Sequence, residues 1–201
     1  MSLIRLALLE GDSEVRELLH GYLCQQPEFE CVVVAPSMEQ LLAELPTLLH
    51  PPHVLLLDSN PPGVEGLPLL RQQLPHTAIV LQTVFDDADR IYQALCQGAS
   101  GYLLKNTPLA ELKAAVRDVV QGGAPMSRAV ARKVLAHFGA QPDGLSAHER
   151  AVVQAIVEGL SEAQVVARLG IAPEAVRASS RLIYGKLAAS TLPAGQKAAK
   201  P

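Results

Sequence analysis

The chain has 201 residues, a formal net charge of −3 and 49% hydrophobic residues, with only 3% aromatics and no tryptophan. This length suits one large domain or two small ones, and the composition is enough for a packed core of Leu, Val and Ala. Apolar runs reach only about six residues, far short of the roughly 18 that span a bilayer. No charged-then-apolar signal segment opens the chain, which predicts a cytoplasmic protein with no membrane partner.

The cysteines are odd in number and widely spaced, at Cys24, Cys31 and Cys96. This spacing fits neither a disulfide framework nor a zinc site. We therefore expect three small, buried, apolar side chains in a reducing compartment.

Charge is distributed unevenly along the chain. Residues 1–120 carry seven Lys and Arg against fifteen Asp and Glu, a net charge of −8. Residues 121–144 carry three against one, and residues 145–201 carry seven against four, which gives +2 and +3. An acidic front half and a mildly basic back half predict two domains with different partners.

Short apolar strands alternate with helical patterns through the front half. The strands are expected at residues 3–9, 30–35, 54–57, 78–82 and 101–104, and the helices at 13–25, 38–49, 67–73, 87–97 and 109–120. Pro46 should kink or shorten the second helix. Five βα units predict an α/β domain with a doubly wound parallel sheet.

Polar side chains follow four of these strands. They are Glu10, with Asp12 close by, then Asp58, Thr83 and Lys105. Ligands of such sheets lie beyond the carboxyl ends of the strands, where the strand order reverses. One polar residue at a strand end is usually the start of a loop. An acid cluster, a hydroxyl and a lysine together predict a functional site at the carboxyl edge of the sheet, which we call the rim.

Several stretches carry a family resemblance. The front half contains "VLLLDSNPPGVEGLPLL" and "GASGYLLKN", and the back half contains "EGLSEAQVVARLGI". Over nearly its whole length the chain resembles the NarL/FixJ response regulators. The resemblance implies a flavodoxin-like receiver domain at 3–121, a linker with a helix at 122–144, a four-helix LuxR-type helix-turn-helix domain at 145–192 and a tail at 193–201.

For the receiver, the resemblance assigns a role to each rim residue. Asp58 matches the phospho-acceptor, with a sensor histidine kinase as the implied donor. Thr83, Tyr102 and Lys105 match the switch and phosphoryl-contacting residues. The Mg²⁺ ligands would be Glu10, Asp58 and Asn60.

The first strand ends unlike the family pattern. Typical members carry two adjacent acids there, whereas this chain has Glu10 and Gly11. Asp12 comes one place later, where we expect it to begin the loop or cap the next helix. Mg²⁺ demands near-ideal octahedral oxygen ligands, so its binding should be weak or absent. Lys105 would then pair with Asp58 at rest, and phosphorylation of Asp58 should be weak or dispensable.

In the back half, a linker helix is expected at 128–138. Helices at 146–159, 161–169 and 173–187 follow the family template, and Ser146 with Glu149 forms a capping-box pattern. The resemblance makes the last of these the recognition helix for double-stranded DNA, with Val176, Ile183 and Leu187 facing the core. Its outward DNA contacts would be Arg177, Arg181 and Lys186.

The end of the chain has few apolar anchors and reads as a weak helix or tail. In the family this region dimerises the DNA-binding domains, so we expect a homodimer made mainly through the receiver, by the helix at 109–120 and its neighbouring strand.

These observations favour a DNA-binding transcription regulator of the two-component type that is not an enzyme. One alternative is an atypical, phosphorylation-independent regulator controlled by a protein or a small ligand. Another is an interaction protein with a decayed DNA-binding domain, and salt-dependent DNA binding would distinguish a transcription regulator from it. An enzyme of phosphoryl hydrolysis is the third, but no substrate-pocket motif accompanies Asp58 and Lys105.

Overall fold

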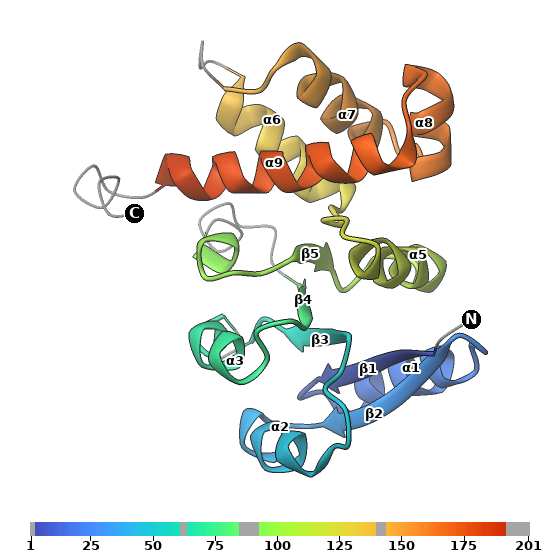
Figure 1. Cartoon of the computed structure of the whole chain (residues 1–201), viewed down its shortest axis with the longest axis vertical. Helices are drawn as coiled ribbons and strands as arrows, with labels where there is room; N and C mark the ends of the chain where they lie inside the picture. Colours follow the sequence, from blue (N-terminus) through green and yellow to red (C-terminus); the bar gives the residue numbers. More distant parts are fainter. Residues whose placement is uncertain (1–2, 61–63, 85–92, 140–143, 192–201) are drawn as a thin grey trace.

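The computed structural model describes residues 3–60, 64–84, 93–139 and 144–191 (Figure 1). Its first half contains a five-stranded parallel sheet in the order β2-β1-β3-β4-β5. The strands are β1 (Ile4–Leu9), β2 (Phe29–Ala35), β3 (Val54–Asp58), β4 (Ala78–Thr83) and β5 (Gly101–Leu104). This order is that of the flavodoxin-like doubly wound fold, so the predicted fold class is confirmed.

Helices connect the strands. They are α1 (Ser13–Cys24), α2 (Met38–Glu44), α3 (Leu67–Gln73) and α5 (Leu109–Val120). Pro46 lies in a short 3₁₀ turn, Leu45–Thr47, that ends α2 early, because its ring cannot continue an α-helix. Most of the helix predicted at 87–97 lies outside the described residues, and residues 93–96 are helical.

The sheet is covered on both faces. Leu19 and Leu23 of α1 pack with Leu112 and Val116 of α5 on one face, while α2 and α3 cover the other. Every residue of β3 is buried, which explains its unbroken apolar sequence.

The second half is helical. It contains α6 (Arg128–Phe138), α7 (Ala147–Val157), α8 (Glu162–Leu169) and α9 (Pro173–Thr191). The predicted capping box is present, since Glu149 N–H donates to Ser146 Oγ while Ser146 N–H donates to the Glu149 carboxylate. Gly170 ends α8 in the left-handed conformation (φ +64°), which turns the chain into α9. Helix α9 continues to Thr191, four residues past its predicted end, and the predicted tail at 193–201 lies outside the described residues.

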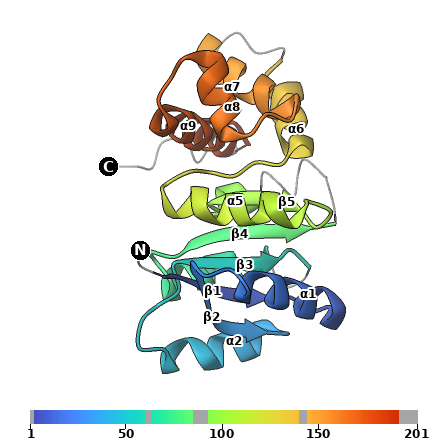
Figure 2. The ribbon, with the colours of Figure 1, turned by 90° about the vertical axis from the view of Figure 1, so that its right-hand side faces the viewer.

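The helical domain sits on the β5 edge of the sheet, with α9 lying across it (Figures 1 and 2). The linker covers that edge. Met126 forms an isolated parallel β-bridge with Tyr102, and the Tyr102 N–H donates to Pro125 O at 3.2 Å. A Cβ at Gly101 would come within 2.7 Å of the Pro125 ring, so only glycine allows this approach. Tyr184 of α9 completes the contact by donating its hydroxyl to Pro125 O at 2.9 Å.

The prediction of three buried cysteines is wrong. Cys24 and Cys96 are exposed and Cys31 is half-buried, and none of the three is joined in a disulfide. Their positions on helix surfaces and an edge strand could not be read from their spacing. Among the described helices, none is both long enough and apolar enough to cross a bilayer.

Candidate functional site: the receiver rim and the recognition helix

The rim lies where the strand order reverses. Strands β1 and β3 are neighbours, and Glu10 follows the first while Asp58 ends the second. Thr83 ends β4, and Lys105 follows β5 with its N–H donating to Thr83 O at 2.7 Å. The fold therefore brings together the four residues that the strand ends singled out.

Lys105 bridges the two acids. Its Nζ lies 2.7 Å from Glu10 Oε2 and 3.0 Å from Asp58 Oδ2. The carboxylates are nearly inaccessible, at 1% and 4% exposure, and Lys105 is 13% exposed. The expected pair between Asp58 and Lys105 is present, and Glu10 makes it a triad.

The triad sets the ionisation of its members. Burial raises the pKa of Glu10, and its bonds from Lys105 and the Asp12 amide offset this only in part. Burial also opposes ionisation of Asp58, but the Asn60 N–H and Lys105 outweigh it and hold the pKa of Asp58 below its usual value. Both carboxylates in turn raise the pKa of Lys105 despite its desolvation. The ammonium thus remains charged between its two partners.

These residues fit a resident Mg²⁺ poorly. The carboxylate oxygens of Glu10 and Asp58 already accept bonds from Lys105, the Asp12 amide and Asn60. Asp12 supplies no third carboxylate, because it caps α1 by accepting from the N–H groups of Glu14 and Val15. An ion would find two carboxylates that are already engaged and no third one, which is an incomplete ligand set for Mg²⁺.

The two switch positions lie inside the fold. Thr83 and Tyr102 are both completely buried. Tyr102 belongs to the cluster of buried side chains that runs from the receiver into the helical domain and includes Tyr184 of α9. A displacement of β5 at the rim would therefore reach α9 through direct packing.

The recognition helix presents its expected apolar face inward. Val176, Ile183 and Leu187 are buried. The outward position predicted for Arg177, however, is not found. Arg177 is only 14% exposed, and its guanidinium contacts Asp118 of α5 at 3.2 Å and Glu162 of α8 at 2.8 Å. The docking of the helical domain onto α5 turns this face of α9 toward the receiver.

The two other predicted DNA contacts also have intramolecular partners. Arg181 donates to the backbone oxygen of Gly122, at the start of the linker. Lys186 contacts Glu149 at 2.6 Å and Gly144 O at 3.2 Å within the helical domain. Of these three cations, Arg177 and Arg181 thus bind the receiver side of the molecule.

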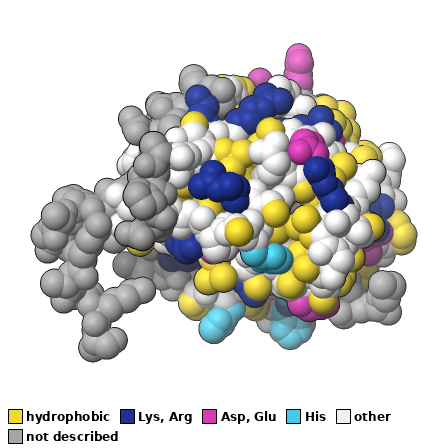
Figure 3. Space-filling view, turned by 90° about the horizontal axis from the view of Figure 1, so that it is seen from above, with side chains coloured by type: hydrophobic (Ala, Val, Ile, Leu, Met, Phe, Trp, Pro, Cys, Tyr) yellow, Lys and Arg dark blue, Asp and Glu magenta, His cyan; other side chains and the backbone are white. Residues whose placement is uncertain are grey.

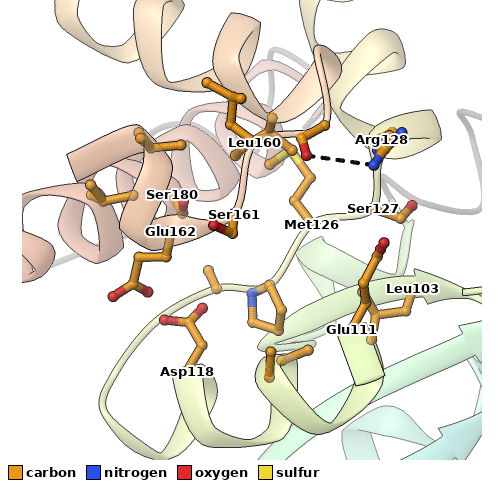
Figure 4. A pocket seen from close by; sticks show the side chains of 18 of the residues that line it. Leu103, Glu111, Asp118, Met126, Ser127, Arg128, Leu160, Ser161, Glu162 and Ser180 are labelled. Carbon is orange, nitrogen blue, oxygen red and sulfur yellow. Dashed lines mark hydrogen bonds between the residues drawn. The ribbon is translucent and has the colours of Figure 1, made fainter. Parts of the chain in front are cut away.

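A pocket of about 290 Å³ separates the two halves beside Arg177. Figure 4 shows its floor on α5, with Glu111 and Asp118, and its roof on Leu160, Ser161 and Glu162. Burial, reinforced by the nearby Glu162 carboxylate, raises the pKa of Asp118 to about 7, although Arg177 opposes the shift. Asp118 is therefore a titratable group at the contact between domains.

The opposite end of the helical domain faces solvent. Basic side chains are scattered over it among apolar ones, and few acidic side chains are visible there (Figure 3). The arrangement suits contact with a polyanion but shows no single dense patch.

Sequence reasoning missed the partners of Arg177. Asp118 lies 59 residues away in another domain, and no periodicity connects the two. Glu162 begins α8 and reads as an ordinary acidic residue of a first helical turn. The charge difference between the two halves was the one signal that pointed to such a contact.

Comparison with known proteins agrees with this architecture. Residues 6–117 match the response regulator receiver domain, and residues 143–194 match the luxR family of bacterial regulatory proteins. The transcriptional regulatory protein UhpA of Salmonella typhimurium is 30% identical over 188 residues, which cover 94% of this chain and 93% of UhpA. The oxygen regulatory protein NreC of Staphylococcus epidermidis is 29% identical, with 92% and 91% covered.

Solved structures show the same fold. The RcsB response regulator of Salmonella typhimurium superposes with a TM-score of 0.63 at 19% identity, over 93% of each chain. ChrA, the response regulator of a heme-sensing two-component system, superposes with a TM-score of 0.52 at 25% identity, over 92% and 90%. With a receiver on β1–α5 and a helix-turn-helix on α8–α9, this chain belongs to the two-component response regulators that carry a LuxR-type DNA-binding domain.

Proposed function

We propose that this chain regulates transcription by binding duplex DNA through Arg177, Arg181 and Lys186 of α9. The helix-turn-helix supports this, because Ser161 caps α8 and Gly170 sets the turn that projects the first turns of α9. Arginine at such positions forks to guanine or clamps phosphate. The relative UhpA is named a transcriptional regulatory protein.

The observation that carries the mechanism is the pair between Arg177 and Asp118. In this pair the receiver holds Arg177, a side chain that DNA binding would need. DNA and α5 therefore compete for one face of α9, and the described arrangement is a closed one. Regulation consists of shifting the balance between this closed form and an open, DNA-binding form.

Phosphorylation is a weak or dispensable trigger for that shift. Asp58 stands at the acceptor position, but at rest it is paired with Lys105, which also contacts Glu10. Mg²⁺ would bind weakly or not at all through Glu10, Asp58 and Asn60, so a phosphodonor such as a sensor histidine kinase would label Asp58 slowly. Thr83 and Tyr102 would respond to a phosphoryl group if one formed.

The pocket beside Arg177 favours a second candidate trigger, a small ligand. Its walls are largely apolar, with side chains such as Ala115, Met126, Leu160 and Val176, and they come from both domains. A ligand held there would bridge the domains and stabilise the closed form. Binding of the neutral dye Nile red to the full chain, lost on filling the pocket by Ala115→Phe, would support this candidate.

A salt series tests the DNA-binding role. The full chain should bind duplexes selected from a randomised pool, with affinity falling steeply as salt rises. Arg181→Ala removes one phosphate contact and should reduce the slope of log K against log salt by about one. Arg117→Ala is the control, because this exposed arginine of α5 pairs with Glu28 in the receiver. Equal affinity and slope for Arg181→Ala and wild type would contradict the assignment.

A further inference from the structure

The receiver carries a cluster of metal-ligating side chains far from the rim. His20 and Cys24 lie on α1, and Cys31 lies on β2. One ligand atom from each, the imidazole nitrogen or the sulfur, lies within 4.8 Å of the other two. Among the described residues, no other group of three His, Cys, Asp or Glu side chains is gathered in this way.

Local structure explains how these residues meet. His20 and Cys24 are four positions apart, so they occupy one face of α1. On β2 the pairing with β1 shifts by one residue between Cys31 and Val33, a β-bulge. The bulge leaves both Cys31 and Val34 against the apolar cluster under α1. Cys31 thereby points to the helix that carries the other two.

The ligand set has a definite chemical preference. Two thiolates and one imidazole are soft to borderline donors, which select Zn²⁺ or Cu⁺ over Mg²⁺ or Ca²⁺. Three protein ligands leave a fourth position for water on Zn²⁺. His20 and Cys24 are exposed, so an ion can enter from solvent without opening the core.

We propose that His20, Cys24 and Cys31 bind one thiophilic d¹⁰ cation, Zn²⁺ or Cu⁺, at the α1–β2 edge of the receiver. Each thiol releases its proton to solvent as its sulfur binds, and the imidazole binds through a neutral nitrogen. With Zn²⁺ the two thiolates balance the ion's charge. The ion would tie the end of α1 to the edge strand of the sheet, at the side farthest from the helical domain (Figure 2).

The two sulfurs make the site selective. Thiolates bind Zn²⁺ and Cu⁺ far more strongly than they bind hard cations such as Mg²⁺ and Ca²⁺. The site is independent of DNA binding and of Asp58.

Co²⁺ titration of the reduced full chain tests the site. Binding should produce, at one equivalent, the thiolate-to-cobalt charge-transfer and tetrahedral d–d bands, which the carboxylates at the rim cannot give. Zn²⁺ should then displace Co²⁺, and a separate competition with a Cu⁺ chelator establishes which ion binds more tightly.

Variants identify the ligands. Cys24→Ser and His20→Gln change exposed residues, so the fold should persist. Each should weaken Co²⁺ binding more than about tenfold, since even residues behind the ligands contribute roughly 10- to 100-fold. Cys96→Ser, which changes the third cysteine, is the control and should bind as wild type does. Absent thiolate bands, or equal binding by wild type, Cys24→Ser and His20→Gln, would overturn the proposal. So would a reversible Cys24–Cys31 disulfide in a protein whose reduced form binds neither ion.

Discussion

At the scale of single residues, the rim shows how one substitution changes a charge network. Where the family pattern has a second acid, this chain has Gly11, and the ammonium of Lys105 lies between Glu10 and Asp58. Each of the two carboxylates therefore has a cationic partner within the chain.

Gly11→Asp should therefore restore the missing ligand. A Cβ at this position would meet only Pro36 O, at 3.9 Å, so the side chain can be accommodated. We expect Mg²⁺ binding to strengthen by roughly tenfold or more, about 1.4 kcal/mol. Intact mass spectrometry after treatment with a small phosphodonor, with and without Mg²⁺, should show faster labelling than in wild type.

Asp58→Asn is the control for that experiment, since it should abolish labelling in either background. Rapid stoichiometric labelling of the wild type, with DNA affinity rising in step, would show that the rim works as an ordinary phospho-switch despite Gly11.

Asp118 gives the domain contact a pH dependence. In the closed form its pKa is about 7, against 3.8 for an exposed aspartate. The closed form therefore binds the proton more tightly, so acid favours closure and a rise in pH through 7 favours opening. Glu162 and Arg177 are the charged groups that act on Asp118 from the packed helices, and Asp118 in turn acts on Tyr184.

DNA affinity of the full chain should accordingly be higher at about pH 8 than at about pH 6. Asp118→Asn mimics the protonated side chain, so it should hold the closed form and remove this difference. Fluorescence anisotropy at both pH values measures the effect. Glu111→Gln, also on α5 and lining the pocket, should behave like wild type. An unchanged pH profile in Asp118→Asn would refute the role of this carboxyl.

At the scale of elements, most of the secondary structure could be predicted from local sequence. The helices at 67–73, 109–120 and 128–138 and the strand at 101–104 begin and end where their sequences indicate. Capping residues and glycines act within one turn, so a short window contains the information. The rim could be predicted for a related reason, because parallel topology brings strand ends together.

The contacts that could not be predicted are those made between distant elements. The turning of Arg177 toward Asp118 depends on how two domains dock, and no local pattern encodes it. The gathering of His20, Cys24 and Cys31 depends on a one-residue register shift in β2. The helical spacing of His20 and Cys24 was the only sequence signal for that cluster.

The capping box at the start of α7 should contribute measurably to stability. Ser146→Ala removes the acceptor for the Glu149 N–H and should lower the free energy of unfolding by about 1 kcal/mol. Urea denaturation followed by circular dichroism measures this. Ser13→Ala is the matched control, because this exposed serine starts α1 where Asp12, not Ser13, is the cap. Equal losses in the two variants would contradict the capping role.

At the scale of the whole molecule, helix α5 has one observed contact surface and one proposed role. It contacts α8 and α9 in the closed form, and it is our proposed dimer surface. One solved RcsB structure is of two dimers bound to DNA. If this chain dimerises through α5, opening frees that surface and the recognition helix together.

Asp118→Lys tests this coupling. A lysine facing Arg177 would repel it and open the molecule, so DNA affinity should rise by about fivefold or more. Sedimentation velocity at matched concentrations should show a larger dimer fraction. Glu111→Lys adds the same charge to α5 without facing Arg177 and should change neither quantity in this way. If Asp118→Lys sediments and binds DNA as Glu111→Lys does, closure does not control assembly.

The linker that covers β5 has a consequence for how the chain can be divided. The linker pairs with the outer edge of β5 through backbone groups. Tyr102 N–H donates to Pro125 O, Met126 forms a β-bridge with Tyr102, and Ser127 N–H donates to Tyr102 O at 3.5 Å. A fragment ending at residue 121 would expose this strand edge, and bare edges invite pairing between chains and aggregation. The folding unit of the receiver thus reaches Ser127, and a receiver expressed alone should be cut after that residue.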